Sequence, residues 1–231
     1  MKIIDNIGRI AKFLRGENLF FSTSFSCPKI TLGNKNASFT VNPSVISKSD
    51  IVYSFGIGTD ISFDLELIKN FGLKVYAFDP TPRSVEWLTK QDVPENFTAF
   101  PFGLANYTGD ADFFLPVNES HVSASMTSRQ SEKFVSVKVK RLSDICKELG
   151  HSSVDILKMD IEGAEYEVLD DIIHSGIPIQ QLLVEFHHRF QAEGSGLTRK
   201  SVEKLKNAGY LLFHVSDNGE EFSFINPGIS K

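Results

Sequence analysis

Carboxylates, imidazoles and glycines stand at the ends of several short apolar runs in this chain. The first run is followed by Gly56 and Gly58, and the next ends in Asp79. Two later runs end at Asp160 and at Glu185, which His187 and His188 follow closely. Open α/β sheets bind ligands beyond the carboxyl ends of their strands. If these runs are strands of one sheet, we expect the acidic groups and imidazoles to converge on one rim and form a binding site.

The stretch from Asp50 to Asp60 predicts a buried strand that runs into a Gly-x-Gly turn, and the spacing from Ser62 predicts a helix that Gly72 ends. Glycines let a ligand approach the backbone closely, and an acidic residue such as Asp79 at the next strand end can accept both ribose hydroxyls. A plain strand-to-helix turn is the alternative. A dinucleotide fingerprint needs a small residue where this chain has Ile61, so the pattern favours a single-nucleoside cofactor such as S-adenosylmethionine over NAD.

The segment Asp160–Glu165 is the most specific signal in the chain. Asp160 directly follows an apolar run, and Gly163 permits a tight turn from strand to helix. Glu162 and Glu165 fall in the first helical turn, where carboxylates complement the helix dipole. For Glu165 we favour this helix-capping role, and for Asp160 we favour a role in the site.

Composition narrows the functional classes. The chain has 231 residues and a formal net charge of −5, which gives no general attraction to nucleic acid or anionic membranes. No stretch is long and apolar enough to span a bilayer, and charged residues interrupt the N-terminus, unlike a secretory signal. Cys27 and Cys146 share no short motif and indicate reduced thiols, so we expect a cytoplasmic protein.

The elements form a series of strand–helix units that ends in a hairpin. We expect further strands at Phe97–Phe100, Ala111–Leu115, Phe134–Val139, Ser153–Asp160, Gln181–Phe186, Gly209–Val215 and Glu221–Ile225, and helices at Pro80–Leu88, Leu142–Leu149 and Ser201–Ala208. The last two strands flank Asp217-Asn-Gly219, a hairpin signal. This order predicts an α/β fold whose central, mostly parallel seven-stranded sheet carries a C-terminal antiparallel hairpin and helices on both faces.

Two domains are expected, an N-terminal helix and β-arm over residues 1–49 and a cofactor-binding domain over 50–231. Residues 1–16 have amphipathic spacing, and packing on the domain's own surface is favoured over a membrane-surface or partner helix. The arm carries β-prone pieces at Lys29–Leu32 and Ser38–Val41. The polar run Asn118–Ser128 fits a lid over the substrate or a merely mobile loop equally well.

The segment Asp160-Ile-Glu-Gly-Ala-Glu165, with the preceding Val137–Asp144 and Val154–Met159, resembles the FkbM family of S-adenosylmethionine-dependent methyltransferases. The likeness runs from about Asp50 to Phe186, and the segments Tyr53–Gly58 and Tyr76–Pro80 look like a divergent branch that includes methyltransferase-like proteins of animals. Many members carry Asp-x-Gly-Ala-Asn at the first turn. Here Ser54 replaces the acidic residue that often helps to hold the methionine part of the cofactor.

This resemblance implies a Rossmann-like class I methyltransferase that transfers a methyl group, usually to oxygen, on a small or glycosylated acceptor. The predicted cofactor contacts are Phe55, Gly56, Ile57, Gly58, Asp79, Pro80, Gly103, Leu104 and Asp160. His187 is predicted to act as general base because a neutral imidazole titrates near working pH, with Glu185 orienting it or the acceptor and Asp160 near the methionine end.

Other interpretations of the same residues stay open. A divalent-metal site built from Asp160, Glu185 and the histidines ranks second, because adjacent histidines on a strand point to opposite sides. Plain surface histidines are the third interpretation. For the whole chain, the alternatives are a cofactor-binding relic that acts as an interaction module, which Ser54 favours, and an NAD-dependent oxidoreductase, which Ile61 and the terminal hairpin disfavour. The acceptor and the oligomeric state are not specified by any motif.

Overall fold

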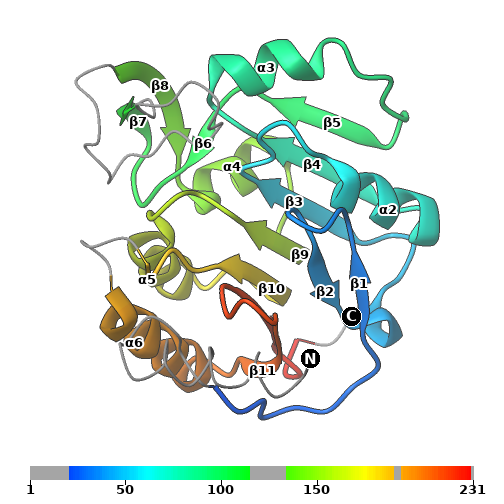
Figure 1. The fold of residues 1–231 in the computed structure, drawn as a ribbon, viewed down its shortest axis with the longest axis vertical. Helices are drawn as coiled ribbons and strands as arrows, with labels where there is room; N and C mark the ends of the chain where they lie inside the picture. Colours follow the sequence, from blue (N-terminus) through cyan, green and yellow to red (C-terminus); the bar gives the residue numbers. More distant parts are fainter. Residues whose placement is uncertain (1–20, 115–133, 190–193, 230–231) are drawn as a thin grey trace, which may run out of the picture.

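The computed structural model describes residues 21–114, 134–189 and 194–229, and the predictions for residues 1–16 and 118–128 lie outside this part. A seven-stranded sheet forms its centre (Figure 1). The spatial order of its strands is β11 (Leu211–Val215), β12 (Glu221–Ile225), β10 (Ile179–Glu185), β9 (Val154–Met159), β3 (Ile51–Phe55), β4 (Lys74–Phe78) and β5 (Phe97–Phe100).

Strand direction in this sheet matches the sequence prediction. β3 pairs in parallel with β4 and with β9, and β9 pairs in parallel with β10. Only β12 runs antiparallel to its neighbours, because the Asp217–Gly219 turn folds it back between β10 and β11. The carboxyl ends of β3, β4, β9 and β10 therefore lie along one edge, which the sequence prediction required.

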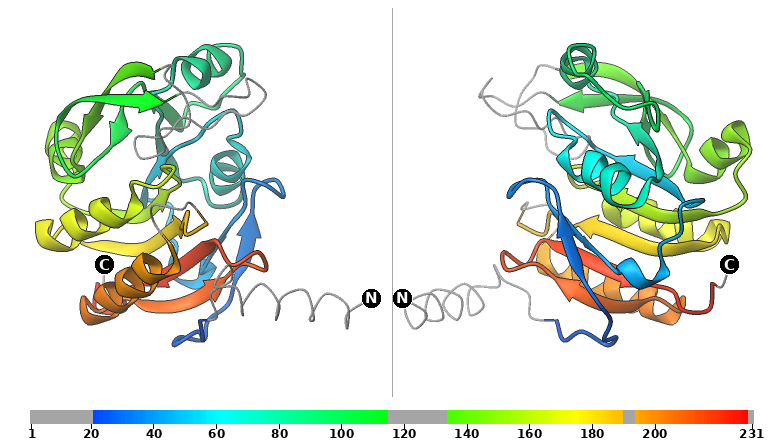
Figure 2. Two further views of the ribbon diagram at one scale, coloured as in Figure 1. Left: turned by 60° about the vertical axis from the view of Figure 1, so that its left-hand side comes forward. Right: turned by 90° about the vertical axis from the view of Figure 1, so that its right-hand side faces the viewer.

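The helices cover both faces of the sheet, as expected (Figure 2). One core lies between the sheet and α4 (Leu142–Leu149), α5 (Glu165–Ser175) and α6 (Gly194–Asn207). The other lies under α2 (Ser62–Phe71), with α3 (Pro82–Leu88) packed at its margin. Both cores consist largely of aliphatic and aromatic side chains from strands that are buried on both faces, the pattern of a covered parallel sheet.

The predicted N-terminal β-hairpin is present as β1 (Ile30–Leu32) and β2 (Phe39–Val41), which pair antiparallel. It lies across the face of the sheet that α2 also covers, and a short 3₁₀ turn, η1 (Pro43–Val45), leads from it towards β3. The Gln181 side chain accepts a hydrogen bond from the Asn42 amide at 2.8 Å and donates one to the Asn42 carbonyl at 3.3 Å. These buried bonds fix the hairpin to β10.

A second, three-stranded sheet stands beside the carboxyl ends of the large one. Its order is β6 (Gly103–Leu104), β8 (Phe134–Lys140) and β7 (Gly109–Phe114). The strands predicted near residues 111–115 and 134–139 are therefore found here rather than in the central sheet. Val137, Val139, Ala111 and Phe113 form a small separate core.

Helix α6 begins at Gly194, earlier than the expected start at Ser201. The glycines at positions 194 and 196 favour a loop by local propensity, but Thr198 is fully buried and its hydroxyl lies 3.0 Å from that of Tyr166. Packing on α5 thus overrides the local preference. Among the described residues, no helix combines the length and the apolar character needed to cross a membrane.

Candidate functional site

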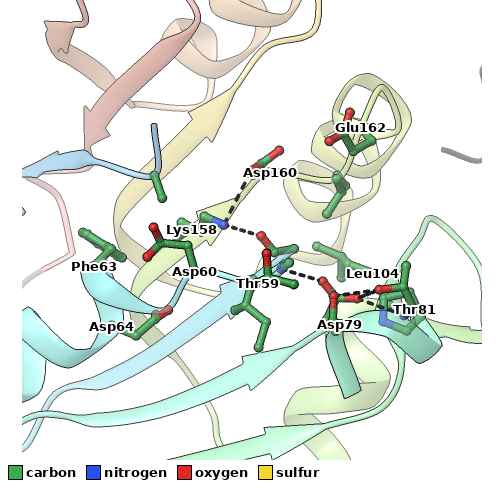
Figure 3. Close-up of a pocket in the computed structure, with 18 of the residues that line it drawn as sticks. Thr59, Asp60, Phe63, Asp64, Asp79, Thr81, Leu104, Lys158, Asp160 and Glu162 are labelled. Carbon is green, nitrogen blue, oxygen red and sulfur yellow. Dashed lines mark hydrogen bonds and ion pairs between the residues drawn. The ribbon is translucent and has the colours of Figure 1, made fainter. Parts of the chain in front are cut away.

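A cavity of about 190 Å³ opens at the carboxyl ends of β3, β4 and β9 (Figure 3). Its walls come from the glycine turn after β3, from the strand ends that carry Asp79 and Asp160, and from Gly103 and Leu104 of β6. The turn between β1 and β2 closes another side through Asn36 and Ala37. The cavity therefore occupies the rim that the sequence predicted as the site.

The glycine turn is held by the strands on both sides of it. The Gly56 amide donates a hydrogen bond to Phe78 O on β4 at 2.9 Å, and the Gly56 carbonyl accepts one from Lys158 Nζ on β9 at 2.7 Å. A Cβ on Gly56 would lie 1.6 Å from the Asp160 carbonyl oxygen, so glycine is required there by backbone crowding. A Cβ on Gly58 would meet nothing within 4 Å, so its absence leaves room in the cavity.

Asp79 lies at the base of the cavity and is almost fully buried. One carboxylate oxygen accepts a hydrogen bond from the Gly58 amide at 2.9 Å, and the other accepts bonds from the Thr81 amide and hydroxyl at 2.9 and 2.6 Å. An ionised carboxylate offers about four acceptor sites, and these three bonds leave one site that can accept a hydrogen bond from a ribose hydroxyl. Apolar groups adjoin it: Pro80, Leu104 and Phe113 line this end.

The opposite end of the cavity is charged. Figure 3 shows Lys158, Asp60 and Asp64 on one side of the cavity and Asp79, Thr81 and Leu104 on the other. Lys158 is 6% exposed and donates hydrogen bonds to the carbonyls of Phe55 and Gly56, at 3.1 and 2.7 Å. Its ammonium therefore fixes the glycine turn to β9.

Asp64, in the first turn of α2, is a buried carboxylate that lines this charged end. Its Oδ1 atom and the neighbouring Ser54 hydroxyl are buried without a well-formed hydrogen bond among the described residues. Burial raises the pKa of Asp64 to about 6, although Lys158 and Ser54 oppose this rise. Asp64 is thus a buried carboxylate with an oxygen that a cationic hydrogen-bond donor of a ligand could bind. It lies next to Ser54, the serine that departs from the family pattern.

A second group of acidic residues surrounds His187 beside the same rim. The imidazole Nδ1 lies 2.8 Å from Glu165 Oε1, and Nε2 lies 3.7 Å from Asp160 Oδ1, 3.4 Å from Glu162 Oε2 and 3.9 Å from Glu185 Oε1. We call these five residues the His187 cluster. Asp160 and Glu162 also line the cavity, so the cluster adjoins its charged end.

The cluster shifts the pKa values of its members. Burial alone would lower the pKa of His187, but the carboxylates of Glu165, Asp160 and Glu162 outweigh it and raise the pKa to about 10. Burial and the neighbouring Asp160 raise the pKa of Glu185 to about 9. Burial likewise raises the pKa of Asp160, against the opposing charges of Lys158 and His187. The carboxylates around His187 therefore favour the protonated form of its imidazole.

The structure brings most of the residues predicted for the site to this rim. Gly56, Ile57, Gly58, Asp79, Pro80, Gly103, Leu104 and Asp160 line the cavity, and Glu185 and His187 lie beside it. Phe55 does not line the cavity: its ring is fully buried and stacks on Phe78 at 4.4 Å. His188 is buried in the turn after β10 and is not one of the possible metal ligands.

Sequence reasoning missed three contributors to the site: Asp64, Lys158 and the β1–β2 turn. Asp64 stands in a helical position that looks like an ordinary first-turn carboxylate, and Lys158 lies within an apolar strand where its charge was the only signal. The β1–β2 turn reaches the site through Asn34, whose amide donates to Ser62 Oγ at 2.7 Å and whose side chain donates to Asp60 at 3.0 Å. No local pattern marks that long-range contact.

The residues present fit S-adenosylmethionine. The open space at Gly58 suits close approach of the cofactor, Asp79 is placed to accept a hydrogen bond from a ribose hydroxyl, and the apolar wall suits adenine. At the charged end, the buried Oδ1 of Asp64 suits the ammonium of the methionine part. An adjoining hollow lined by Ile57, Val85, Leu88, Ala99, Phe100 and Pro101 extends the apolar side.

Comparison with known proteins agrees with this site. The model of the methyltransferase FkbM domain matches residues 22–212. The probable methyltransferase-like protein 24 of Homo sapiens is 25% identical over 187 residues, 76% of this chain and 45% of that protein. The Rattus norvegicus protein of the same name is 26% identical over 71% of this chain and 42% of its own length. The chain thus spans less than half the length of these relatives.

A third relative is the hexuronic acid methyltransferase AglP of Haloferax volcanii, 27% identical over 65% of this chain and 60% of that protein. Among solved structures, the fibrillarin pre-rRNA processing protein of Methanococcus jannaschii is 10% identical, with a TM-score of 0.48 over 90% of this chain and 86% of that chain. The family model covers most of the chain, including both strand ends that carry Asp79 and Asp160. The chain belongs to the FkbM methyltransferase domain family, and S-adenosylmethionine is the cofactor that this membership implies.

Proposed function

We propose that this protein transfers the methyl group of S-adenosylmethionine to a hydroxyl oxygen of a small-molecule or sugar acceptor. The observation that carries the proposal is the polarity of the cavity, with apolar groups and Asp79 at one end and Asp64 and Lys158 at the other. This matches a cofactor whose adenosine and amino-acid ends differ in the same way. The His187 cluster then adjoins the end at which the reactive methyl group would lie.

The cofactor's sulfonium is already activated, so the protein's task is to place the acceptor and to manage its proton. The acceptor oxygen forms a bond to the methyl carbon, the carbon–sulfur bond breaks, and its electron pair stays on sulfur to give S-adenosylhomocysteine. The hydroxyl proton leaves to a base or to solvent. Asp160, Glu185 and His187 are the catalytic residues of this proposal. The surrounding carboxylates raise the pKa of His187 and favour its protonated form, which opposes the base role predicted for it.

The acceptor class rests on two supports. Carboxylates of the His187 cluster are suited to hydrogen bonds from hydroxyl groups, and AglP, a relative of this chain, is named for methylation of a hexuronic acid. A sugar hydroxyl is therefore our first choice of acceptor.

Calorimetry with S-adenosylmethionine, S-adenosylhomocysteine and NAD tests the proposal. We expect saturable binding of both adenosyl compounds and none of NAD, because Ile61 and the charged end of the cavity suit one nucleoside with an amino-acid tail. Methyl transfer to a panel of sugars and other hydroxylated acceptors would follow. Absence of adenosyl binding would contradict the proposal and favour the relic, and binding of NAD alone would favour an oxidoreductase.

Asp64 gives a pH-dependent prediction. We expect Asp64→Asn to weaken binding of S-adenosylhomocysteine about tenfold at pH 7.5, the loss of one charge-assisted hydrogen bond of about 1.5 kcal/mol. Because the pKa of Asp64 is about 6, the wild-type carboxylate becomes neutral as the pH falls through that value, and its affinity should decline towards that of the variant. Calorimetry at several pH values checks this, with the exposed Asp112→Asn as the matched control.

The same carboxylate affects stability without cofactor. The raised pKa means that the folded chain binds more protons at Asp64 than the unfolded chain between about pH 4 and 6. The contribution of Asp64 to the free energy of unfolding therefore falls as pH rises through this window. Asp64→Asn should flatten the dependence there, and equal slopes for the variant and wild type would argue against a buried, neutral Asp64.

A further inference from the structure

The geometry of the His187 cluster is that of a metal-binding set. Asp160, Glu185 and His187 each offer one ligand atom, and these atoms all lie within 4.8 Å of one another. They come from the end of β9, the end of β10 and the residues just after it. β9 and β10 are hydrogen-bonded neighbours that pair in parallel, so the backbone fixes the spacing of these three side chains.

Separations between the ligand atoms suit a small divalent cation. Bonds of about 2.1 Å place neighbouring ligand atoms about 3 Å apart and opposite ones about 4.2 Å apart. Nε2 of His187 lies 3.7 Å from Asp160 Oδ1 and 3.9 Å from Glu185 Oε1, within that range and too far for hydrogen bonds. Glu162 Oε2, at 3.4 Å from Nε2, is near enough to supply a further ligand.

Glu165 orients the imidazole in the way that metal-ligating histidines require. Its carboxylate is fully buried and is itself held by the amides of Ile161 and Gly163, at 3.1 and 3.0 Å. With Nδ1 bonded to this carboxylate, Nε2 is the nitrogen that faces Asp160, Glu162 and Glu185. A carboxylate bonded to the second ring nitrogen is the usual outer partner of a histidine ligand.

Acidic side chains outnumber basic ones around the described part of this cluster. Four carboxylates surround one imidazole, and among the described residues the Lys158 ammonium is 3.9 Å from the nearest of them, Asp160. Lys158 is already bonded to two backbone carbonyls. Side-chain exposures of 22% for Glu185, 27% for Asp160 and 11% for His187 show that one side of the cluster is open to the rim. A cation could therefore enter, and water or an acceptor could complete its coordination.

We propose that Asp160, Glu185 and His187 bind one divalent cation beside the charged end of the cavity, with Glu162 as a further ligand and Glu165 as the positioning residue. The chemical role of this site rests on the proposed methyl transfer. A divalent cation lowers the pKa of a hydroxyl that contacts it, so the acceptor proton can pass to solvent. His187 is then a ligand rather than the general base, and the need for a neutral imidazole base disappears.

Mn²⁺ is the probe that tests the site, because it accepts both carboxylate and imidazole ligands and its aqueous EPR signal reports the unbound ion. We expect the full chain to bind one Mn²⁺ without any cofactor present. Glu185→Gln, which keeps the shape of the side chain, should weaken this binding at least tenfold. The matched control is Glu203→Gln on the exposed face of α6, which should bind Mn²⁺ like the wild type.

Glu165→Gln is a second variant with a different expected result. It keeps every proposed ligand but removes the carboxylate charge that is bonded to Nδ1, so we expect a weakening of about 10- to 100-fold, typical of outer partners of metal ligands. Thermal unfolding of each variant shows whether it is folded before its affinity is compared. Equal Mn²⁺ binding by Glu185→Gln and Glu203→Gln would overturn the proposal. The bound Mn²⁺ would then be an adventitious ion only.

Binding of S-adenosylhomocysteine in EDTA separates this inference from the proposed function. A protein that binds the cofactor product in EDTA but holds no Mn²⁺ overturns the metal site and leaves methyl transfer standing. A protein that binds Mn²⁺ through Glu185 but does not bind S-adenosylhomocysteine supports the metal site and contradicts the proposed function.

Discussion

Replacing Asp79 by alanine is expected to lower the affinity for S-adenosylhomocysteine by roughly 100-fold. The carboxylate is placed to accept a hydrogen bond from a ribose hydroxyl, and the loss of one strong charge-assisted hydrogen bond of about 2.8 kcal/mol corresponds to that factor. Asp79 also holds the Gly58 amide at 2.9 Å, so the variant loosens the turn against which the cofactor would lie. Isothermal titration calorimetry measures the effect directly.

Two further variants show whether the lost affinity comes from the carboxylate of Asp79. Asp79→Asn keeps one acceptor oxygen and should give an intermediate affinity, whereas the exposed Asp112→Ala should change nothing. The melting temperature of Asp79→Ala shows whether the fold survives. If a folded Asp79→Ala protein had wild-type affinity, the ribose would not lie at this end of the cavity, and our placement of the cofactor would be wrong.

Alanine at Gly56 is expected to affect mainly stability, and alanine at Gly58 mainly cofactor binding. Both glycines have positive φ, 73° and 52°, so each substitution carries a backbone penalty of about 1–2 kcal/mol. At Gly56 the new Cβ would also lie 1.6 Å from the Asp160 carbonyl oxygen, which forces β3 and β9 apart. We expect Gly56→Ala to lower the free energy of unfolding by about 3–5 kcal/mol, the size of a severe steric defect.

Gly58→Ala should leave the fold intact and lower the affinity for the cofactor. Its Cβ meets no atom within 4 Å, so only the backbone penalty applies to stability, but the methyl group enters the space where we place the cofactor. Chemical denaturation and calorimetry measure the two properties. Gly150→Ala is the control. This glycine follows α4, has a φ of 73° and an equally open Cβ position, and is not among the residues that line the cavity. If Gly58→Ala and Gly150→Ala bound S-adenosylhomocysteine equally, the cofactor would not lie against Gly58.

Much of the fold follows from the sequence, because its signals are local. Helix α2 begins and ends where its spacing and Gly72 predict, and Gly72 adopts the left-handed conformation expected of a helix C-cap. The strands that carry Asp79, Asp160 and Glu185 are short apolar runs between turn signals, and each was predicted within two residues of its observed bounds. Parallel strands place their carboxyl ends on one edge, so the general position of the site followed from the element order alone.

The tertiary structure decided what surrounds each of these groups. His187 was assigned the chemistry of an isolated imidazole, but the fold places Glu165, Glu162, Asp160 and Glu185 around it and raises its pKa to about 10. Phe55 was expected at the cofactor, but its ring turns into the aromatic core against Phe78. Both outcomes depend on residues that are distant in the sequence.

Asp64 shows the same division most clearly. The sequence showed that Ser54 lacks the carboxylate common in the family, and it showed an unremarkable Asp64 in the first turn of the next helix. Only the packing of α2 on the central sheet buries that carboxylate beside Ser54 and at the wall of the cavity. The sequence by itself determined the elements, their order and the rim, because periodicity and turn residues are local; burial, pKa and the partners of a charge were decided by tertiary structure, because they depend on contacts between distant segments.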